Sequence, residues 1–336
     1  MHQIFMQRAI ELARRAGSAT KSNPQVGAVL VYEDKIIGEG YHKAYGEAHA
    51  EVNAVQSVSN QNRHLIKDST IYVSLEPCCF FGKTPACTDL ILKEQIKKVV
   101  ISYVDKTPEV SGHGIEILRS KGVEVIEHVL SDAGELLAQP RNTLADKGRP
   151  YVILKFAESK DGYFSLPNQQ VWLTNHYSKI LVHKWRGESD AILVGTNTIR
   201  VDNPTLTNRL YFGTNPDRIV LDKNLELDKH LNVFNSDAKT IVLNDTLTEG
   251  NYFKCSMDWN SILKQLGELK IKTLFVEGGA QVLNTIFESD LWDECRLLIS
   301  PKTLGNGLKI NKPDNWNIKQ TLHLGSDQII QAFPMS

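Results

Sequence analysis

Two short motifs near the N-terminus carry side chains that can bind a metal and move a proton. His49 and Glu51 stand two positions apart, and Cys78 and Cys87 lie in the run LEPCCFFGKTPAC. One imidazole and two thiolates suit zinc, and three protein ligands leave a fourth tetrahedral position for water, which marks a catalytic site. Zinc activates water at neutral pH, and Glu51 is close enough in sequence to shuttle a proton. Cys79 competes with Cys78, but neighbouring side chains point apart, so we expect Cys79 not to be a ligand.

A glycine turn in the second half of the chain has the features of a phosphate-binding site. The run FVEGGA, which contains Glu277 and Gly279, passes from an apolar strand through Gly-Gly into a helix. Such a turn exposes N–H groups at a helix N-terminus and suits a phosphate. The run differs from G-x-G-x-x-G, so a Rossmann domain is not indicated.

Hydrophobic periodicity predicts the elements that must position the first motif. The expected helices cover about 4–16, 48–58, 86–96 and 114–121, and the expected strands cover about 26–32, 35–40, 70–75, 98–104 and 123–129. Glu33 and Asp34 separate the first two strands and indicate a hairpin. Strands that alternate with helices predict an α/β sandwich around a mostly parallel sheet.

A polar segment with two prolines and a glycine, QPRNTLADKGRP at 139–150, precedes a second α/β alternation. There the expected helices lie near 176–187, 259–267 and 280–289, and the expected strands near 151–156, 190–194, 218–222, 239–243, 273–276, 296–300 and 328–333. A chain of 336 residues is long enough to form two hydrophobic cores. We therefore expect one domain over 1–146 and a second over 147–336.

Charge and composition narrow the class of protein. The chain has 38 basic and 39 acidic residues, which argues against a general nucleic-acid binder. Three of its five cysteines fall within ten residues, which is typical of metal ligands rather than of a disulfide framework. The N-terminus lacks the apolar core of a signal peptide, and no run approaches ~18 apolar residues. These features predict a cytoplasmic enzyme that binds neither nucleic acid nor a membrane.

The pattern His-x-Glu followed by Pro-Cys resembles the signature of the cytidine-deaminase-like zinc enzymes. The spacing in LEPCCFFGKTPAC, with NPQVG at 23–27 and GEAHAEV at 46–52, is similar to the deaminases of riboflavin biosynthesis. The resemblance implies an N-terminal cytidine-deaminase-like α/β/α sandwich, with zinc on His49, Cys78 and Cys87 and with Glu51 as the catalytic carboxylate. The implied substrate is 2,5-diamino-6-(5-phosphoribosylamino)pyrimidin-4(3H)-one, and the positions that match its binding residues are Asn23, His42, Lys83 and Thr84.

The chain departs from this family's pattern at several positions near the site. Cys79 and Phe80 stand where the family usually has Ser-His, Ala86 stands for a proline, and Lys106 replaces the proline of Asp-Pro. Phe80 can stack on a base but cannot donate a hydrogen bond. The segment 139–142 also lacks the family's usual Asn-x-x-Phe. These departures keep open the alternative of a single-activity enzyme with one degenerate half.

The second half resembles the reductase of the same pathway, which has a dihydrofolate-reductase-like α/β fold. The resemblance covers roughly 150–310 and rests on Lys155, the run SKDG at 159–162, VGTNTIRVDNPTLTNR at 194–209 and VEGGA at 276–280. It implies that NADPH reduces the ribosyl group of 5-amino-6-(5-phosphoribosylamino)uracil to ribityl. The matching cofactor positions are Ala157, Trp172, Thr198, Asp202 and Gly279. The matching substrate positions are Arg186, Leu206, Arg209 and Glu277.

The hypothesis that follows is a bifunctional enzyme that acts on small phosphorylated pyrimidines with zinc and NADPH. A nucleic-acid-editing zinc deaminase shares the His-Glu-Cys-Cys chemistry, but the near-neutral charge and the second half count against it. A non-catalytic protein with structural zinc would have no use for Glu51. Enzymes of this kind often self-associate, so a homo-oligomer is also an alternative to a monomer.

Overall fold

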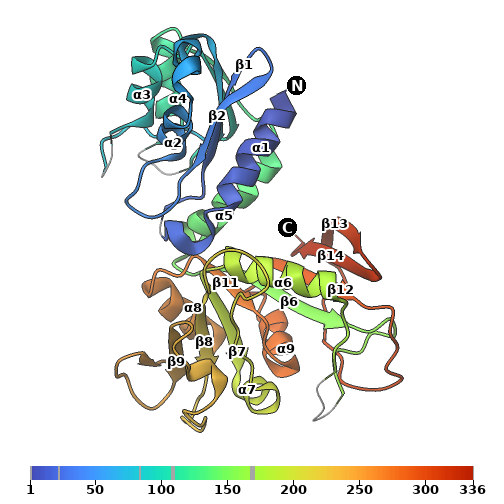
Figure 1. The fold of residues 1–336 in the computed structure, drawn as a ribbon. Helices are drawn as coiled ribbons and strands as arrows, with labels where there is room; N and C mark the ends of the chain where they lie inside the picture. The colour runs from blue at the N-terminus through green and yellow to red at the C-terminus, as the bar shows by residue number, and fades with distance from the viewer. Residues whose placement is uncertain (1, 22, 83–84, 107–109, 167–170, 336) are drawn as a thin grey trace. The chain divides into compact units, whose positions relative to one another are not determined.

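The computed structural model describes residues 2–21, 23–82, 85–106, 110–166 and 171–335. The chain divides into two compact units, Met1–Lys147 (unit 1) and Gly148–Ser336 (unit 2). Each unit has its own sheet and its own buried clusters (Figure 1). Within the part of the chain that is described, no helix combines the length and the apolarity that crossing a bilayer requires.

The sheet of unit 1 has five strands in the order β2-β1-β3-β4-β5. Their bounds are β1 (Gly27–Tyr32), β2 (Lys35–Tyr41), β3 (Thr70–Leu75), β4 (Lys98–Tyr103) and β5 (Glu124–Ile126). The expected hairpin is confirmed, because Glu33 and Asp34 both have positive φ, as a two-residue type I′ turn requires. The expectation of a mostly parallel sheet holds only for β3, β4 and β5, since β1 runs antiparallel to both of its neighbours.

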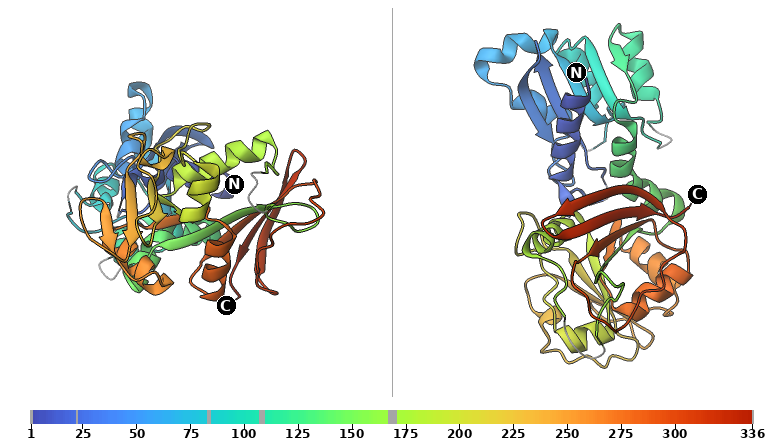
Figure 2. Two further views of the ribbon diagram at one scale, coloured as in Figure 1. Left: turned by 90° about the horizontal axis from the view of Figure 1, so that it is seen from below. Right: turned by 90° about the vertical axis from the view of Figure 1, so that its right-hand side faces the viewer.

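Helices cover both faces of this sheet, which confirms the α/β/α sandwich (Figures 1 and 2). One face packs against α1 (His2–Arg14) and α5 (Ser131–Lys147), and the other against α2 (Ala50–Gln56), α3 (Cys87–Lys93) and α4 (His113–Ser120). Two 3-10 segments, Gly17–Thr20 and Asn60–Asp68, complete the unit. Helix α1 approaches β1 so closely that a Cβ on Gly27 would lie 2.0 Å from the carbonyl oxygen of Ala9. Only glycine allows this approach.

The polar segment 139–150, where the sequence predicts the domain boundary, is largely helical. Most of it belongs to α5, which contains Pro140 in its interior. Proline removes one backbone hydrogen bond from the helix, but the packing of α5 against the sheet compensates for this loss. A Cβ on Gly134 would lie 2.4 Å from Ser102 Oγ of β4, and Ala138 is buried against Leu75 and Tyr103. Close packing on the sheet therefore outweighs the polar composition of the segment.

The sheet of unit 2 has nine strands in the order β10-β9-β8-β7-β11-β6-β12-β14-β13. It is parallel from β10 to β12 and antiparallel across β12, β14 and β13. The strands are β6 (Tyr151–Glu158), β7 (Ala191–Gly195), β8 (Asp217–Leu221), β9 (Thr240–Asn244), β10 (Tyr252–Lys254), β11 (Thr273–Val276), β12 (Glu294–Ile299), β13 (Asn317–Leu324) and β14 (Asp327–Phe333).

Among the described residues of unit 2, four helices cover the two faces of this sheet and bury separate apolar clusters. Helices α8 (Trp259–Glu268) and α9 (Ala280–Glu288) supply one cluster, and α6 (His176–Glu188) and α7 (Thr196–Asp202) supply the other. A 3-10 turn at Asn232–Phe234 lies between β8 and β9. The sequence did not indicate β13, because seven of its eight residues are exposed and no burial pattern marks it. Figure 2 shows β13 and β14 as a long curved hairpin.

Candidate active sites

Three predicted zinc ligands of unit 1 converge at the ends of three elements. His49 directly precedes α2, Cys78 follows β3, and Cys87 is the first residue of α3. His49 Nδ1 lies 3.5 Å from Cys78 Sγ and 3.3 Å from Cys87 Sγ. All three ligand atoms lie within 4.8 Å of one another. Cys79 is not part of this group.

These distances fit a tetrahedral zinc ion. Zinc–nitrogen and zinc–sulfur bonds of ~2.1 and ~2.3 Å at tetrahedral angles separate nitrogen from sulfur by about 3.6 Å. The observed separations of 3.3 and 3.5 Å are close to that value. The backbone N–H of Cys87 also donates to Cys78 Sγ at 3.4 Å, a contact that stabilises negative charge on this sulfur. The donor set and its spacing therefore match a three-ligand zinc centre.

Glu51 lies in the first turn of α2 and is almost fully buried beside the three ligands. Burial raises the pKa of its carboxyl group to about 7, and the charge of Cys78 adds to this effect while His49 opposes it. The pKa of Cys78 is lowered to about 4, chiefly by its hydrogen bonds with Cys87 and His49. The predicted catalytic carboxylate thus lies in direct electrostatic contact with the metal ligands.

Glu76 holds the N-terminal turn of α4 against the end of β3, and no sequence motif indicates this role. Its carboxylate accepts backbone N–H groups from Gly112 at 3.0 Å and Gly114 at 2.9 Å, and longer bonds from Asp105 and Ile115 at 3.3 Å each. Glu76 is 4% exposed and precedes Cys78 by two residues. It therefore fixes the chain at the point where the strand delivers a zinc ligand.

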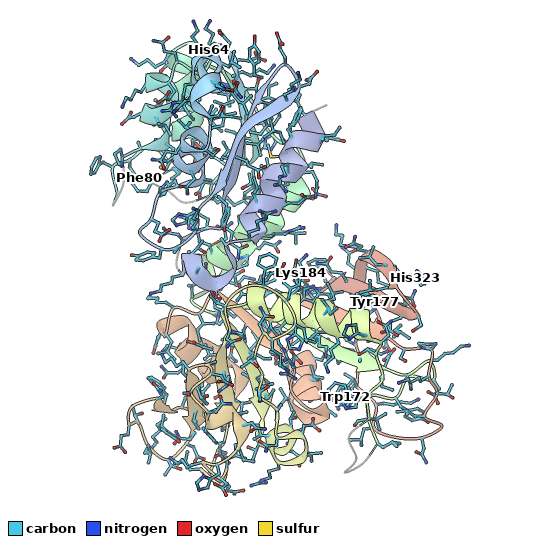
Figure 3. All side chains as sticks on the ribbon, viewed as in Figure 1. His64, Phe80, Trp172, Tyr177, Lys184 and His323 are labelled. Atoms are coloured by element: carbon cyan, nitrogen blue, oxygen red, sulfur yellow. The ribbon has the colours of Figure 1, made fainter. Side chains whose placement is uncertain are left out.

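A cavity of about 240 Å³ opens onto His49, Cys78 and Glu51. Two predicted substrate residues, Asn23 and His42, line it together with Phe80. His42 Nδ1 donates to Ala48 O at 3.1 Å, so His42 Nε2 is the acceptor for the Asn23 amide at 3.0 Å. Phe80 is 49% exposed and projects from its loop (Figure 3). The other two predicted positions, Lys83 and Thr84, lie outside the described residues.

An ion pair that the sequence did not predict also lines this cavity. Arg141 of α5 donates from Nη1 to both oxygens of Asp105, at 2.8 and 3.1 Å. The side chain of Asp105 is only 6% exposed, and that of Arg141 is 23% exposed. The two residues are 36 positions apart, so no local signal in the sequence connects them.

In unit 2, Arg186 and Glu277 form a buried paired contact. Arg186 Nε and Nη2 donate to the two carboxylate oxygens of Glu277 at 2.7 and 3.0 Å. Lys155 Nζ lies 3.7 Å from Glu277, and Arg186 Nη1 donates to Thr207 O at 3.2 Å. Burial raises the pKa of Glu277, but the charges of Arg186 and Lys155 outweigh it and lower the value to about 2. The cluster thus carries two cations for one carboxylate, and Arg209 adds a third cation nearby.

The predicted cofactor positions lie on several elements of unit 2. Gly279 precedes α9, and a Cβ there would lie 2.8 Å from Thr198 Oγ1 of α7, so these two positions adjoin. Trp172 is 61% exposed, with Lys179 Nζ 4.7 Å from its ring centre (Figure 3). Ala157 lies on β6, and Asp202 ends α7 and is exposed. Among these residues the structure establishes direct proximity only for Gly279 and Thr198.

Leu206 differs from the other predicted substrate residues because it is buried in the core. It is 3% exposed and packs in the cluster that contains Val182 and Ile199. Its φ is +52°, in the left-handed region that non-glycine residues rarely adopt. The side chain of Leu206 therefore shapes the fold of the loop.

Comparison with known proteins matches each half of the chain to a protein family. Residues 150–329 match the family model of the RibD C-terminal domain, and residues 1–103 match the cytidine and deoxycytidylate deaminase zinc-binding region. The riboflavin biosynthesis protein RibD of Aquifex aeolicus is 37% identical over 97% of this chain and 96% of its own length. That of Escherichia coli is 30% identical over 97% of each chain.

Solved structures agree with these relatives. A diaminohydroxyphosphoribosylaminopyrimidine deaminase/5-amino-6-(5-phosphoribosylamino)uracil reductase from Thermotoga maritima is 35% identical, covers 99% of both chains and superposes with a TM-score of 0.89. One form of RibD from Acinetobacter baumannii is 29% identical, with a TM-score of 0.85, and covers 100% of this chain and 99% of that chain. The chain therefore belongs to the RibD family of riboflavin biosynthesis proteins, which are bifunctional enzymes with a zinc-dependent deaminase domain and an NADPH-dependent reductase domain.

Proposed function

We propose that residues 1–146 deaminate 2,5-diamino-6-(5-phosphoribosylamino)pyrimidin-4(3H)-one and that residues 147–336 then reduce the product. The observation that carries the proposal is the convergence of His49, Cys78 and Cys87 around the buried Glu51. Water replaces the amino group and ammonia leaves in the first step. NADPH then reduces the ribosyl group of 5-amino-6-(5-phosphoribosylamino)uracil to ribityl in the second.

In the first site His49, Cys78 and Cys87 would hold zinc. Zinc held there supplies a Lewis acid that makes water nucleophilic at neutral pH. Glu51 takes the proton from the attacking water and returns it to the departing amine, which requires a carboxyl group within reach of both. Its burial keeps bulk water from competing for that proton.

The cavity in front of these residues would hold the pyrimidine. The Asn23 amide and the His42 imidazole are linked to each other, so both present fixed polar atoms at the cavity wall. Phe80 offers an aromatic face on which a base can stack. Lys83 and Thr84 are proposed to hold the phosphate on the strength of the resemblance alone.

In the second site the excess of cations supports phosphate binding by Arg186 and Arg209. Glu277 balances only part of the charge of Arg186 and Lys155, and Arg209 adds to the positive potential. Glu277 also aligns Arg186 and would contact the sugar. Leu206 would contact the substrate through its backbone. NADPH supplies the hydride, and the chain positions it. Its contacts are proposed at Ala157, Trp172, Thr198, Asp202 and Gly279.

Replacing Glu51 with glutamine tests whether each half of the chain catalyses one of the two reactions. Ammonia release should fall by at least ~10²-fold, because general acid–base catalysis is lost, while NADPH oxidation on the deaminated substrate stays at the wild-type rate. Glu116→Gln on the exposed side of α4 is the matched control and should leave both activities intact. Loss of both activities in a folded Glu51→Gln protein would refute the assignment of one reaction to each half.

We further propose that the enzyme is cytoplasmic, acts on free small molecules and does not bind nucleic acid. The near balance of 38 basic and 39 acidic residues supports this view. Tight, salt-sensitive binding of tRNA would contradict it. A homo-oligomer is also proposed, and sedimentation of the purified chain measures it directly.

A further inference from the structure

One face of α6 forms hydrogen bonds with the loop that contains Arg209. The segment 205–209, which we call the arginine loop, lies against His183, Arg186 and Gly187 of that helix. The backbone N–H of Arg209 donates to His183 Nδ1 at 3.1 Å, and Arg186 Nη1 donates to Thr207 O at 3.2 Å. A Cβ on Gly187 would lie 2.6 Å from Asn208 Nδ2, so the helix and the loop are in close contact.

His183 accepts this hydrogen bond as a neutral imidazole. A backbone N–H can only donate, so Nδ1 must carry a lone pair. The ring is 2% exposed. Burial lowers its pKa to about 4, with further lowering by Arg186, Arg209 and Lys179, while Glu277 raises it. At neutral pH the ring is therefore an uncharged acceptor among several cations.

The arginine loop needs such an external hold. Leu206 has a φ of +52°, which costs a non-glycine residue about 1 kcal/mol or more and persists only where its surroundings enforce it. Arg209 Nη1 donates to the side-chain hydroxyl of Thr205 at 2.7 Å, so a second residue of this short loop also sets the direction of the guanidinium. Removing the acceptor at His183 would free the backbone of Arg209, the residue whose guanidinium must point at the phosphate.

The choice of an imidazole also preserves the positive potential. An aspartate could accept the same hydrogen bond, but its negative charge would pair with Arg186 and Arg209 and weaken their attraction for a phosphate. A neutral acceptor holds the loop without this cost. The same reasoning predicts that asparagine, whose amide oxygen can take the place of Nδ1, is a functional replacement.

We propose that His183 is a positioning residue of the reductase, which fixes the backbone of Arg209 and thereby aims the arginine pair at the substrate phosphate. The inference rests on the proposed function of Arg186 and Arg209. His183 itself does not need to contact the substrate. Its effect should appear in substrate binding rather than in cofactor binding.

Three substitutions in the full chain test the proposal through steady-state NADPH oxidation. His183→Leu should raise the KM for the phosphorylated substrate by about 10- to 100-fold, because the partly buried N–H of Arg209 loses its acceptor. His183→Asn should stay within about threefold of wild type, whereas His183→Asp should raise KM by about tenfold or more. The KM for NADPH should change by less than about twofold in each variant. Lys184→Gln, the adjacent residue of α6 (Figure 3), is the control and should resemble wild type.

The outcomes separate this inference from the proposed function. If Arg209→Met raises the KM but His183→Leu leaves it unchanged, or His183→Asn raises it as much as His183→Asp does, the positioning role is wrong and the phosphate site stands. If Arg209→Met and Arg186→Met leave the KM unchanged, the phosphate site itself is wrong. Should His183→Leu fail to fold, the asparagine and aspartate pair still decides, because they differ in charge and hardly in shape. A fall in kcat and melting temperature without a change in KM would also overturn the proposal.

Discussion

Replacing Glu76 with glutamine removes half of the acceptors that hold the loop before α4. The glutamine oxygen can keep the bonds from Gly114 and Ile115, which Oε1 accepts in the wild type. The new NH₂ group then faces the N–H groups of Gly112 and Asp105, so two donors lose their acceptor.

The cost follows from the burial and the two bond lengths. A buried donor without a partner costs ~1–3 kcal/mol. The 3.0 Å bond from Gly112 should lie near the top of this range, and the 3.3 Å bond from Asp105 near the bottom. We therefore expect a loss of about 3 kcal/mol, which corresponds to roughly a 10²-fold rise in local opening. Zinc affinity should fall by about tenfold, since Glu76 supports the chain at Cys78.

Hydrogen exchange measured by mass spectrometry on peptides that cover 110–118 reports this opening directly. The amides of Gly112, Gly114 and Ile115 should exchange about 10² times faster in Glu76→Gln than in wild type. Glu116→Gln, an exposed change in the same peptide, is the matched control and should shift stability by less than ~0.5 kcal/mol. Equal exchange in the two variants would show that the carboxylate does not hold the loop.

Three further perturbations address other parts of the molecule. The free energy of unfolding of unit 2 should fall as the pH drops from 6.5 to about 4, because His183 is protonated at a higher pH in the unfolded chain than in the folded chain. Denaturant titrations of His183→Asn at these pH values should show a pH dependence that is smaller by about 3 kcal/mol. The contribution of Glu277, whose pKa is about 2 in the fold, should be lost only below pH 4.5, and Glu277→Gln should flatten the pH dependence in that window. Gly27→Ala should lower the melting temperature of unit 1, because the added Cβ meets Ala9 O at 2.0 Å and forces α1 away from the sheet; an unchanged melting curve would contradict this packing.

The elements that bury an apolar face were predictable from sequence. The strand at Gly27–Tyr32 and the strand at Ala191–Gly195 are nearly continuous apolar runs, and the structure buries almost every residue in them. Helix α5 was missed because its polar residues and Pro140 resemble a linker, and its contacts with β4 depend on the approach of small residues such as Gly134. Strand β13 was missed because both of its faces are exposed.

The zinc site was predictable because ligand chemistry restricts the residue types and their spacing. His49, Cys78 and Cys87 are therefore recognisable in sequence and adjacent in the structure. The supporting contacts were not recognisable, since a carboxylate such as Glu76 that accepts backbone N–H groups can stand anywhere the loop reaches. His183 likewise looks like any helix residue until the arginine loop folds onto it.

Zinc content per chain tests the central claim most directly, because the deaminase assignment requires one zinc held by His49, Cys78 and Cys87. Mass spectrometry of metal in the purified chain should find about one zinc per wild-type molecule and the same amount in Cys255→Ser, whose thiol lies outside the cluster. Cys87→Ser should lose most of its zinc while the reductase half still oxidises NADPH. A Cys87→Ser chain that keeps a full equivalent of zinc would contradict the metal centre described above.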